Sequence, residues 1–176
     1  MGRIEEAVGH MTEKGSEGLL DLTIKTIESR SFSYQLEEGG VVALMVRGTT
    51  SAWPCRITVD EDEDWRSVII ISQAPVAIPE LRRQAVSEWI LRKNYGTRIG
   101  SFQIDLDDGE VYYKTELAAA DAIVTSAMLG AILDTNLYMM DSSVQGLMMI
   151  AFGGADPLSV LDDGAEIPEG SEGPLQ

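Results

Sequence analysis

The stretch GSFQIDLDDGEVYYKTEL, residues 100–117, has an acidic centre that fits either a calcium-binding loop or the turn of a β-hairpin. An EF-hand loop needs oxygen ligands at alternating positions, a glycine at its sixth position and a glutamate at its twelfth. Counted from Asp105, the glycine arrives one position early, at Gly109, and the twelfth residue is Glu116, within a run that alternates like a strand. The spacing therefore argues against a calcium loop.

The residues on each side of this acidic centre alternate between two kinds of side chain. The apolar or larger members of the two runs are Phe102, Ile104, Leu106, Val111, Tyr113 and Thr115. Glycine supplies the positive φ that a tight turn between two strands requires. Two alternating runs joined by a short Asp/Gly connection therefore predict a β-hairpin.

Periodicity outside the hairpin predicts further strands and helices. The predicted strands cover residues 32–36, 41–46, 53–59 and 65–72. The predicted helices cover residues 16–30, 79–96 and a C-terminal region that begins at Asp121, breaks near Asn136 or Asp141 and resumes over 142–152. In the helix that Pro79 opens, the predicted buried stripe contains Leu81, Ala85, Val86, Trp89 and Ile90. Because short turns join neighbouring runs, the strands are expected to pair antiparallel, which places the chain in the α+β class.

Composition predicts one domain with an extension at each end. The chain has 176 residues, of which 44% are hydrophobic, and this is enough for a core of its own. The domain is predicted to span residues 16–161. Residues 1–15 carry only a weak apolar pattern between glycines and are predicted to be a mobile lead-in. Residues 162–176 are mostly Asp, Glu, Gly, Pro and Ser and are predicted to be a disordered acidic tail.

Charge and cysteine content limit the class of partner and the compartment. A formal net charge of -16 repels phosphate backbones and anionic membrane surfaces, so we expect neither nucleic acid nor a membrane as a partner. Three aspartates divide the apolar region 118–152 into pieces shorter than a membrane span. The single cysteine, Cys55, lies in an alternating run and is predicted to be a small buried hydrophobe. A lone cysteine fits a reducing cytoplasm, where we expect the protein to act.

The sequence contains no recognisable catalytic constellation. His10 is the only histidine, and the glycine pairs lack the spacing of a phosphate-binding loop. We therefore predict no catalytic residue, no metal ligand and no cofactor. One alternative remains, a metal-dependent sensor or a carboxylate-based enzyme that uses the acidic turns at residues 60–64 and 105–110. Consecutive carboxylates on a turn are more often simply solvated.

Two of the predicted strands are apolar toward both faces of the sheet. Residues 41–46 and 68–71 do not alternate, so each needs a cover on both sides. Either the chain itself supplies the second cover, or a partner does. Methionines in the C-terminal region support a partner, since their side chains adapt to varied surfaces, although most methionines are ordinary core. The predicted partner-binding residues are Val42, Leu44, Val46, Val68, Ile70, Met139 and Met140.

Several segments, taken in their order and spacing, resemble one known family. They are Trp53, Val59-Asp60-Glu61, VAIPE at 76–80, Asn94, GSFQIDLDDGEVYYK at 100–114, the helix around Asp141 and GGADP at 153–157. Together they resemble the YbjN family, bacterial proteins described as sensory transduction regulators. The resemblance covers roughly residues 16–161, and it leaves out the N-terminal segment and the acidic tail.

The resemblance implies a fold like that of the type III secretion chaperones. In that fold a twisted antiparallel sheet of about five or six strands packs helices on one face, and the molecules commonly form homodimers. It implies no catalytic residues. We therefore expect a non-enzymatic protein-binding module, chaperone-like or regulatory, that acts as a homodimer through an apolar sheet or helix surface and binds a protein client or itself.

Overall fold

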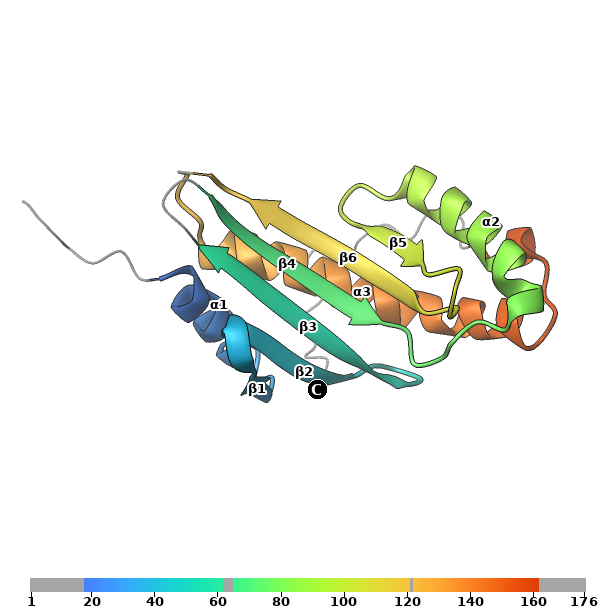
Figure 1. Ribbon diagram of the computed structural model, residues 1–176, viewed down its shortest axis with the longest axis horizontal. Helices are drawn as coiled ribbons and strands as arrows, with labels where there is room; N and C mark the ends of the chain where they lie inside the picture. Colours follow the sequence, from blue (N-terminus) through green and yellow to red (C-terminus); the bar gives the residue numbers. More distant parts are fainter. Residues whose placement is uncertain (1–17, 62–64, 121, 162–176) are drawn as a thin grey trace, which may run out of the picture.

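Six strands form one antiparallel sheet in the computed structural model, which describes residues 18–61, 65–120 and 122–161 (Figure 1). In sheet order they are β1 (Tyr34–Leu36), β2 (Val41–Arg47), β3 (Ala52–Glu61), β4 (Arg66–Gln73), β6 (Val111–Ala118) and β5 (Ser101–Ile104). Every neighbouring pair is antiparallel. The predicted α+β class is confirmed, and the hairpin predicted from residues 100–117 is the β5–β6 pair at one edge of the sheet.

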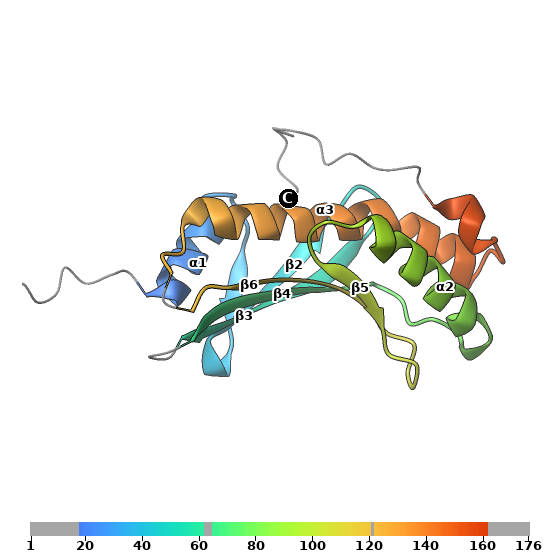
Figure 2. The ribbon, with the colours of Figure 1, turned by 90° about the horizontal axis from the view of Figure 1, so that it is seen from above.

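The helices of the described residues lie on one face of this sheet, as expected (Figure 2). They are α1 (Leu19–Glu28), α2 (Glu80–Gly96) and α3 (Ser126–Ala151), with short 3-10 turns at η1 (Glu38–Gly40) and η2 (Pro157–Val160). Helix α3 crosses the middle of the sheet, and α1 and α2 lie toward its two ends (Figure 2). The opposite face carries no α-helix from the described part of the chain, and the short turn η1 lies toward that side (Figure 2).

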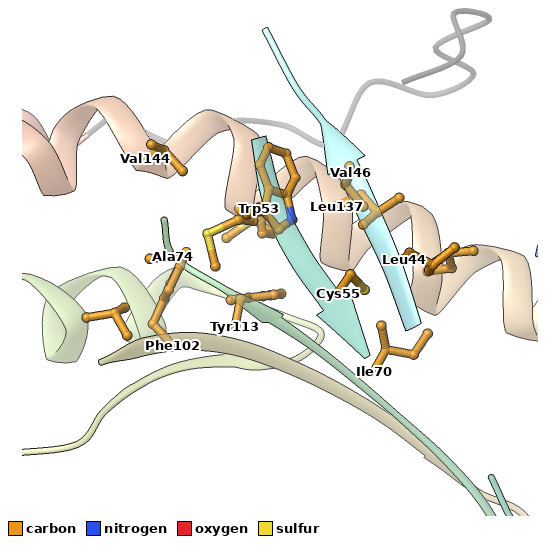
Figure 3. Packing of buried hydrophobic residues seen from close by; sticks show 14 of the residues in the cluster. Leu44, Val46, Trp53, Cys55, Ile70, Ala74, Phe102, Tyr113, Leu137 and Val144 are labelled. Carbon is orange, nitrogen blue, oxygen red and sulfur yellow. The ribbon is translucent and has the colours of Figure 1, made fainter. Parts of the chain in front are cut away.

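Alternation along the strands directs one set of side chains toward α3. In strand β3, Trp53, Cys55 and Ile57 are buried while Arg56 and Thr58 are exposed. Figure 3 shows Trp53, Cys55 and Ile70 with other buried side chains between the sheet and α3. Burying a large aliphatic side chain contributes about 1.5–3 kcal/mol, so this layer supplies most of the driving force for folding.

A buried polar network lies at the centre of this apolar layer. The side chain of Asn136, which is fully buried in α3, donates to the carbonyl oxygens of Ile70 and Tyr113 at 3.0 Å each. Its own oxygen accepts from the Ser72 hydroxyl at 2.6 Å, and that hydroxyl accepts from the Trp53 indole nitrogen at 3.0 Å. The network joins α3 to strands β3, β4 and β6, and it satisfies both ends of the amide.

Helix α3 is continuous, so the predicted break near Asn136 or Asp141 is wrong, and the helix begins at Ser126 instead of Asp121. Both polar residues that suggested the break make tertiary contacts from within the helix. Asp141 accepts from the backbone nitrogen of Thr49 at 2.8 Å and from its hydroxyl at 2.7 Å. These bonds hold the turn between β2 and β3 against α3.

Two arginines, one after α1 and one in α2, also hold α3 in place. Arg30, just after α1, forms two hydrogen bonds with the carboxylate of Asp134, at 2.7 and 2.8 Å. Arg82 of α2 donates to the carbonyl oxygens of Ile150 and Ala155, at 2.8 and 3.0 Å. A cationic group at the C-terminal end of a helix also interacts favourably with the helix dipole.

Helix α2 is apolar on both sides, which the predicted buried stripe did not anticipate. Val86, Trp89 and Ile90 are buried as predicted, and Ala85 is half-buried. Leu81 is 95% exposed, so its place in that stripe is wrong.

The predicted lead-in at residues 1–15 and the predicted tail at 162–176 lie outside the described residues. Among the described residues, no helix combines the length and the apolar character needed to cross a membrane.

We predict that Asn136→Leu lowers the free energy of unfolding by about 3 kcal/mol, because the Ile70 and Tyr113 carbonyls and the Ser72 hydroxyl lose a buried partner. Urea denaturation followed by circular dichroism measures the change. Gln145→Leu, at an exposed position of the same helix, serves as the control and is expected to change it by less than about 0.5 kcal/mol. Equal midpoints for the Asn136 variant and the original chain would contradict the assigned role of the network.

Candidate functional site: the uncovered sheet face

The seven residues predicted to bind a partner lie in the core of a single subunit. Their exposed fractions are Val42 0%, Leu44 4%, Val46 0%, Val68 1%, Ile70 2%, Met139 9% and Met140 0%. The five strand residues point toward the helices, and both methionines belong to the buried side of α3. These side chains are therefore not available as an exposed surface, and the set needs correction.

Successive side chains of a strand point to opposite faces of the sheet. The residues on the face away from the helices are therefore the sequence neighbours of the predicted ones. We call the apolar and polar side chains on that face the uncovered sheet face. Its apolar members are Val41, Ala43, Met45, Pro54, Ile69 and Ile71. Met45 is 68% exposed and the others are half-buried. The premise that residues 41–46 and 68–71 are apolar toward both faces is confirmed.

The sheet register places these side chains in rows across the strands. In one row Val41 pairs with Thr58, Thr58 with Ile69 and Ile69 with Glu116. In the next row Ala43 pairs with Arg56, Arg56 with Ile71 and Ile71 with Lys114. Apolar columns on β2 and β4 thus alternate with polar columns on β3 and β6.

The uncovered sheet face is close to neutral although the chain is strongly acidic. Its cations are Arg47, Arg56 and Lys114, and its anions are Asp60 and Glu116. Lys114 pairs with Glu116 at 2.6 Å, and Arg56 pairs with Glu37 of the neighbouring β1–β2 connection at 3.4 Å. Exposed ion pairs contribute little stability, yet they leave no excess of one sign to repel an approaching partner.

One edge of the sheet is closed by a side chain that imitates a strand. The amide of Asn94 donates to the carbonyl oxygen of Phe102 at 2.9 Å and accepts from its backbone nitrogen at 2.8 Å. An edge strand with free backbone groups invites another strand to pair with it. At β5 the Asn94 amide already occupies both backbone groups of Phe102, so a further strand pairs less readily at this edge. Docking on the face is favoured over docking at this edge.

A second apolar surface lies on the outer side of α2. Leu81 and Tyr95 are each 95% exposed, and Leu91 is 73% exposed. Glu88 and Arg92 form an ion pair at 2.8 Å on the same side of the helix. Helical spacing places all five side chains along one stripe.

The acidic turn of the hairpin uses its carboxylates for turn formation. Asp105 accepts from the backbone nitrogen of Asp107, and Asp108 accepts from that of Glu110, each at 2.8 Å. Residues 62–64 of the other predicted acidic turn lie outside the described residues. Within the described part of the chain, no group of three or more His, Cys, Asp or Glu side chains could hold a metal ion.

Burial changes the pKa of two side chains between the sheet and the helices, Cys55 and Tyr113. It raises the pKa of the Cys55 thiol to about 12, since the thiolate would lie in an apolar layer, and a hydrogen bond with Ser72 lowers the pKa by a smaller amount. Burial also raises the pKa of the Tyr113 hydroxyl. A thiol that stays protonated is a poor nucleophile, so Cys55 acts as a packing residue, as predicted from the sequence.

Comparison with known families gives one match. The model of the YbjN family, described as "Putative bacterial sensory transduction regulator", matches residues 20–147. The matched range begins in α1 and ends in α3, so it contains all six described strands and the uncovered sheet face. No curated protein matches the chain.

The buried Cys55 thiol predicts a loss of stability in alkali. The thiol ionises near pH 9 in the unfolded chain but only near pH 12 in the fold, so the folded state holds one more proton between these values. Unfolding is therefore increasingly favoured as the pH rises above 9, by up to about 4 kcal/mol from this group. Urea midpoints at pH 8 and pH 10.5, compared between the original chain and Cys55→Ala, measure its share. A pH dependence identical in both would show that Cys55 contributes nothing to it.

Proposed function

The chain belongs to the YbjN family, and from this premise we propose that it is a non-enzymatic regulatory module that binds a segment of a client protein on the uncovered sheet face. The observation that carries the proposal is the apolar set on β2 and β4 that faces away from the three described α-helices. The family's description as a regulator fits binding better than catalysis.

The chemistry of the face indicates the kind of segment that it binds. The apolar columns on β2 and β4 bury apolar side chains of an extended segment, and the polar columns on β3 and β6 supply hydrogen bonds beside them. Because the face is nearly neutral, such a segment approaches without the repulsion that the rest of an acidic chain exerts on anions. A chaperone-like hold on a client in the cytoplasm is consistent with this chemistry.

We also propose that two copies associate through the outer stripe of α2. A two-fold symmetric contact uses the same patch on both copies, so the patch must complement itself. The stripe meets this condition, since a neighbouring copy can place its Arg92 beside Glu88 and its Leu91 and Tyr95 against the same apolar side chains. The stripe and the sheet face lie on different sides of the domain, so the two contacts are compatible (Figure 2).

The client surface is tested by a pair of substitutions at adjacent positions. Ile71→Asp, on the uncovered face, is expected to remain folded, at a cost of about 1 kcal/mol, and to lose proteins that the original chain retains by affinity capture from its native cytoplasm. Ile70→Asp, one residue away and 2% exposed, is expected to unfold the domain. Gln145→Asp, exposed on α3, should capture the same proteins as the original chain. Undiminished capture by Ile71→Asp would exclude this face.

Self-association is tested by sedimentation of the full chain. We expect a particle of twice 19.1 kDa for the original chain and for Gln145→Asp. Leu91→Asp places a charge in the apolar stripe and should shift the protein to a monomer, with an unchanged circular dichroism spectrum because the side chain is 73% exposed. An original chain that sediments as a monomer at all concentrations, or a Leu91 variant that remains a dimer, would rule out this contact.

A further inference from the structure

An open pocket of about 240 Å³ lies at one end of the uncovered sheet face. It is formed where β3, the end of β4 and the β5–β6 hairpin meet the connection to α2. Its lining residues are Pro54, Gln73, Ala74, Pro75, Val76, Ala77 and Glu110. Pro54 shares its face with Met45, its partner in the register, so the pocket continues the apolar columns described above.

The pocket wall is held in place by the hairpin. The backbone nitrogens of Ala74 and Ile78 donate to the carbonyl oxygens of Val111 and Gly109, at 2.7 Å each, and residues 75–77 lie between these two bonds. Gly109 has φ +84, and a Cβ there would lie 2.2 Å from the carbonyl oxygen of Ile78. Only glycine allows this close approach, so the glycine that the hairpin turn requires also shapes the pocket.

The lining combines apolar walls with a single carboxylate. Two prolines, a valine and two alanines supply the walls, and the polar groups are Gln73 and Glu110. Glu110 accepts a hydrogen bond from the hydroxyl of Tyr112, which is a neutral donor. Within the described residues, no Lys or Arg side chain forms an ion pair with Glu110. The pocket therefore presents a negative charge that a ligand can neutralise.

The size of the pocket limits what can occupy it. Small-molecule and cofactor sites usually enclose about 300–1,000 Å³, so a pocket of about 240 Å³ suits one or two amino-acid side chains. A lysine or arginine side chain has an aliphatic stem that packs on apolar walls and a cationic head that pairs with a carboxylate. We propose that this pocket takes a Lys or Arg side chain of the client segment, and that this residue anchors the segment at the end of the sheet.

The overall charge of the chain supports a cationic anchor. A net charge of -16 attracts basic segments at long range, while the near-neutral centre of the face provides no such preference. Glu110 would convert this general attraction into recognition of one position in the bound segment. The inference rests on the proposed binding of a client segment, and it adds the chemical identity of one client residue.

The test is a selection of random displayed peptides on the purified full-length chain, on Glu110→Gln and on Asp107→Asn. The glutamine variant keeps the shape of the pocket and removes its charge. The asparagine variant removes the same charge from the same hairpin, at a position that does not line the pocket. A selected peptide is then synthesised with its recurrent cationic residue or with norleucine, and both versions are titrated against each protein and against Ile71→Asp.

We expect Lys or Arg to recur at one position in peptides selected on the original chain and on Asp107→Asn, but not on Glu110→Gln. Replacing that residue by norleucine should weaken binding about tenfold to the original chain and leave binding to Glu110→Gln unchanged. Peptides that bind the uncovered face without a cationic preference, or whose preference persists in Glu110→Gln, would overturn the anchor and leave the proposed function standing. A selection that enriches no peptide, or only peptides insensitive to Ile71→Asp, would overturn both.

Discussion

The arrangement of the domain depends on one buried side-chain amide, that of Asn136, between α3 and the sheet. Apolar side chains alone leave a helix free to slide or rotate on a sheet, since many placements bury similar areas. A buried amide with fixed partners removes this freedom, because any other placement leaves it or the strand carbonyls unsatisfied. The amide reaches both β4 and β6, so it also holds these strands in register beneath the helix.

Fixing α3 on one face determines what happens to the other. Strands β2 and β3, β3 and β4, and β5 and β6 are chain neighbours that pair directly, and the α-helices come before β1, between β4 and β5, and after β6. The three α-helices lie on the face of the sheet that Asn136 contacts (Figure 2). Strands β2 and β4 carry apolar side chains on both faces, and no described α-helix covers the second face. The uncovered sheet face is thus a consequence of the topology combined with the composition of β2 and β4.

Sequence reasoning reached the class of fold, the strands and the β5–β6 hairpin, because period-two alternation is a local signal. It could not decide between Val42 and Val41, or between Ile70 and Ile71, since a strand without alternation carries no information about its orientation. That information lies in the pairing. Cys55 of the alternating strand β3 pairs with Leu44 and Ser72, and directly paired residues share a face. The break predicted near Asn136 or Asp141 is wrong for a related reason. A polar residue within an apolar helical run locally suggests a break, but here each polar side chain bonds to a distant part of the chain.

The distribution of charge accounts for how such a domain can bind without aggregating. A chain of net charge -16 repels its own copies, yet neither the uncovered sheet face nor the outer stripe of α2 carries an excess of negative charge. The uncovered face carries three cations and two anions, and the outer stripe of α2 carries one cation, Arg92, paired with one anion, Glu88. Contacts at these places avoid both like-charge repulsion and the cost of burying unpaired carboxylates. The rest of the surface is acidic and repels other copies of the chain. Association is therefore directed to the two patches where this repulsion is absent.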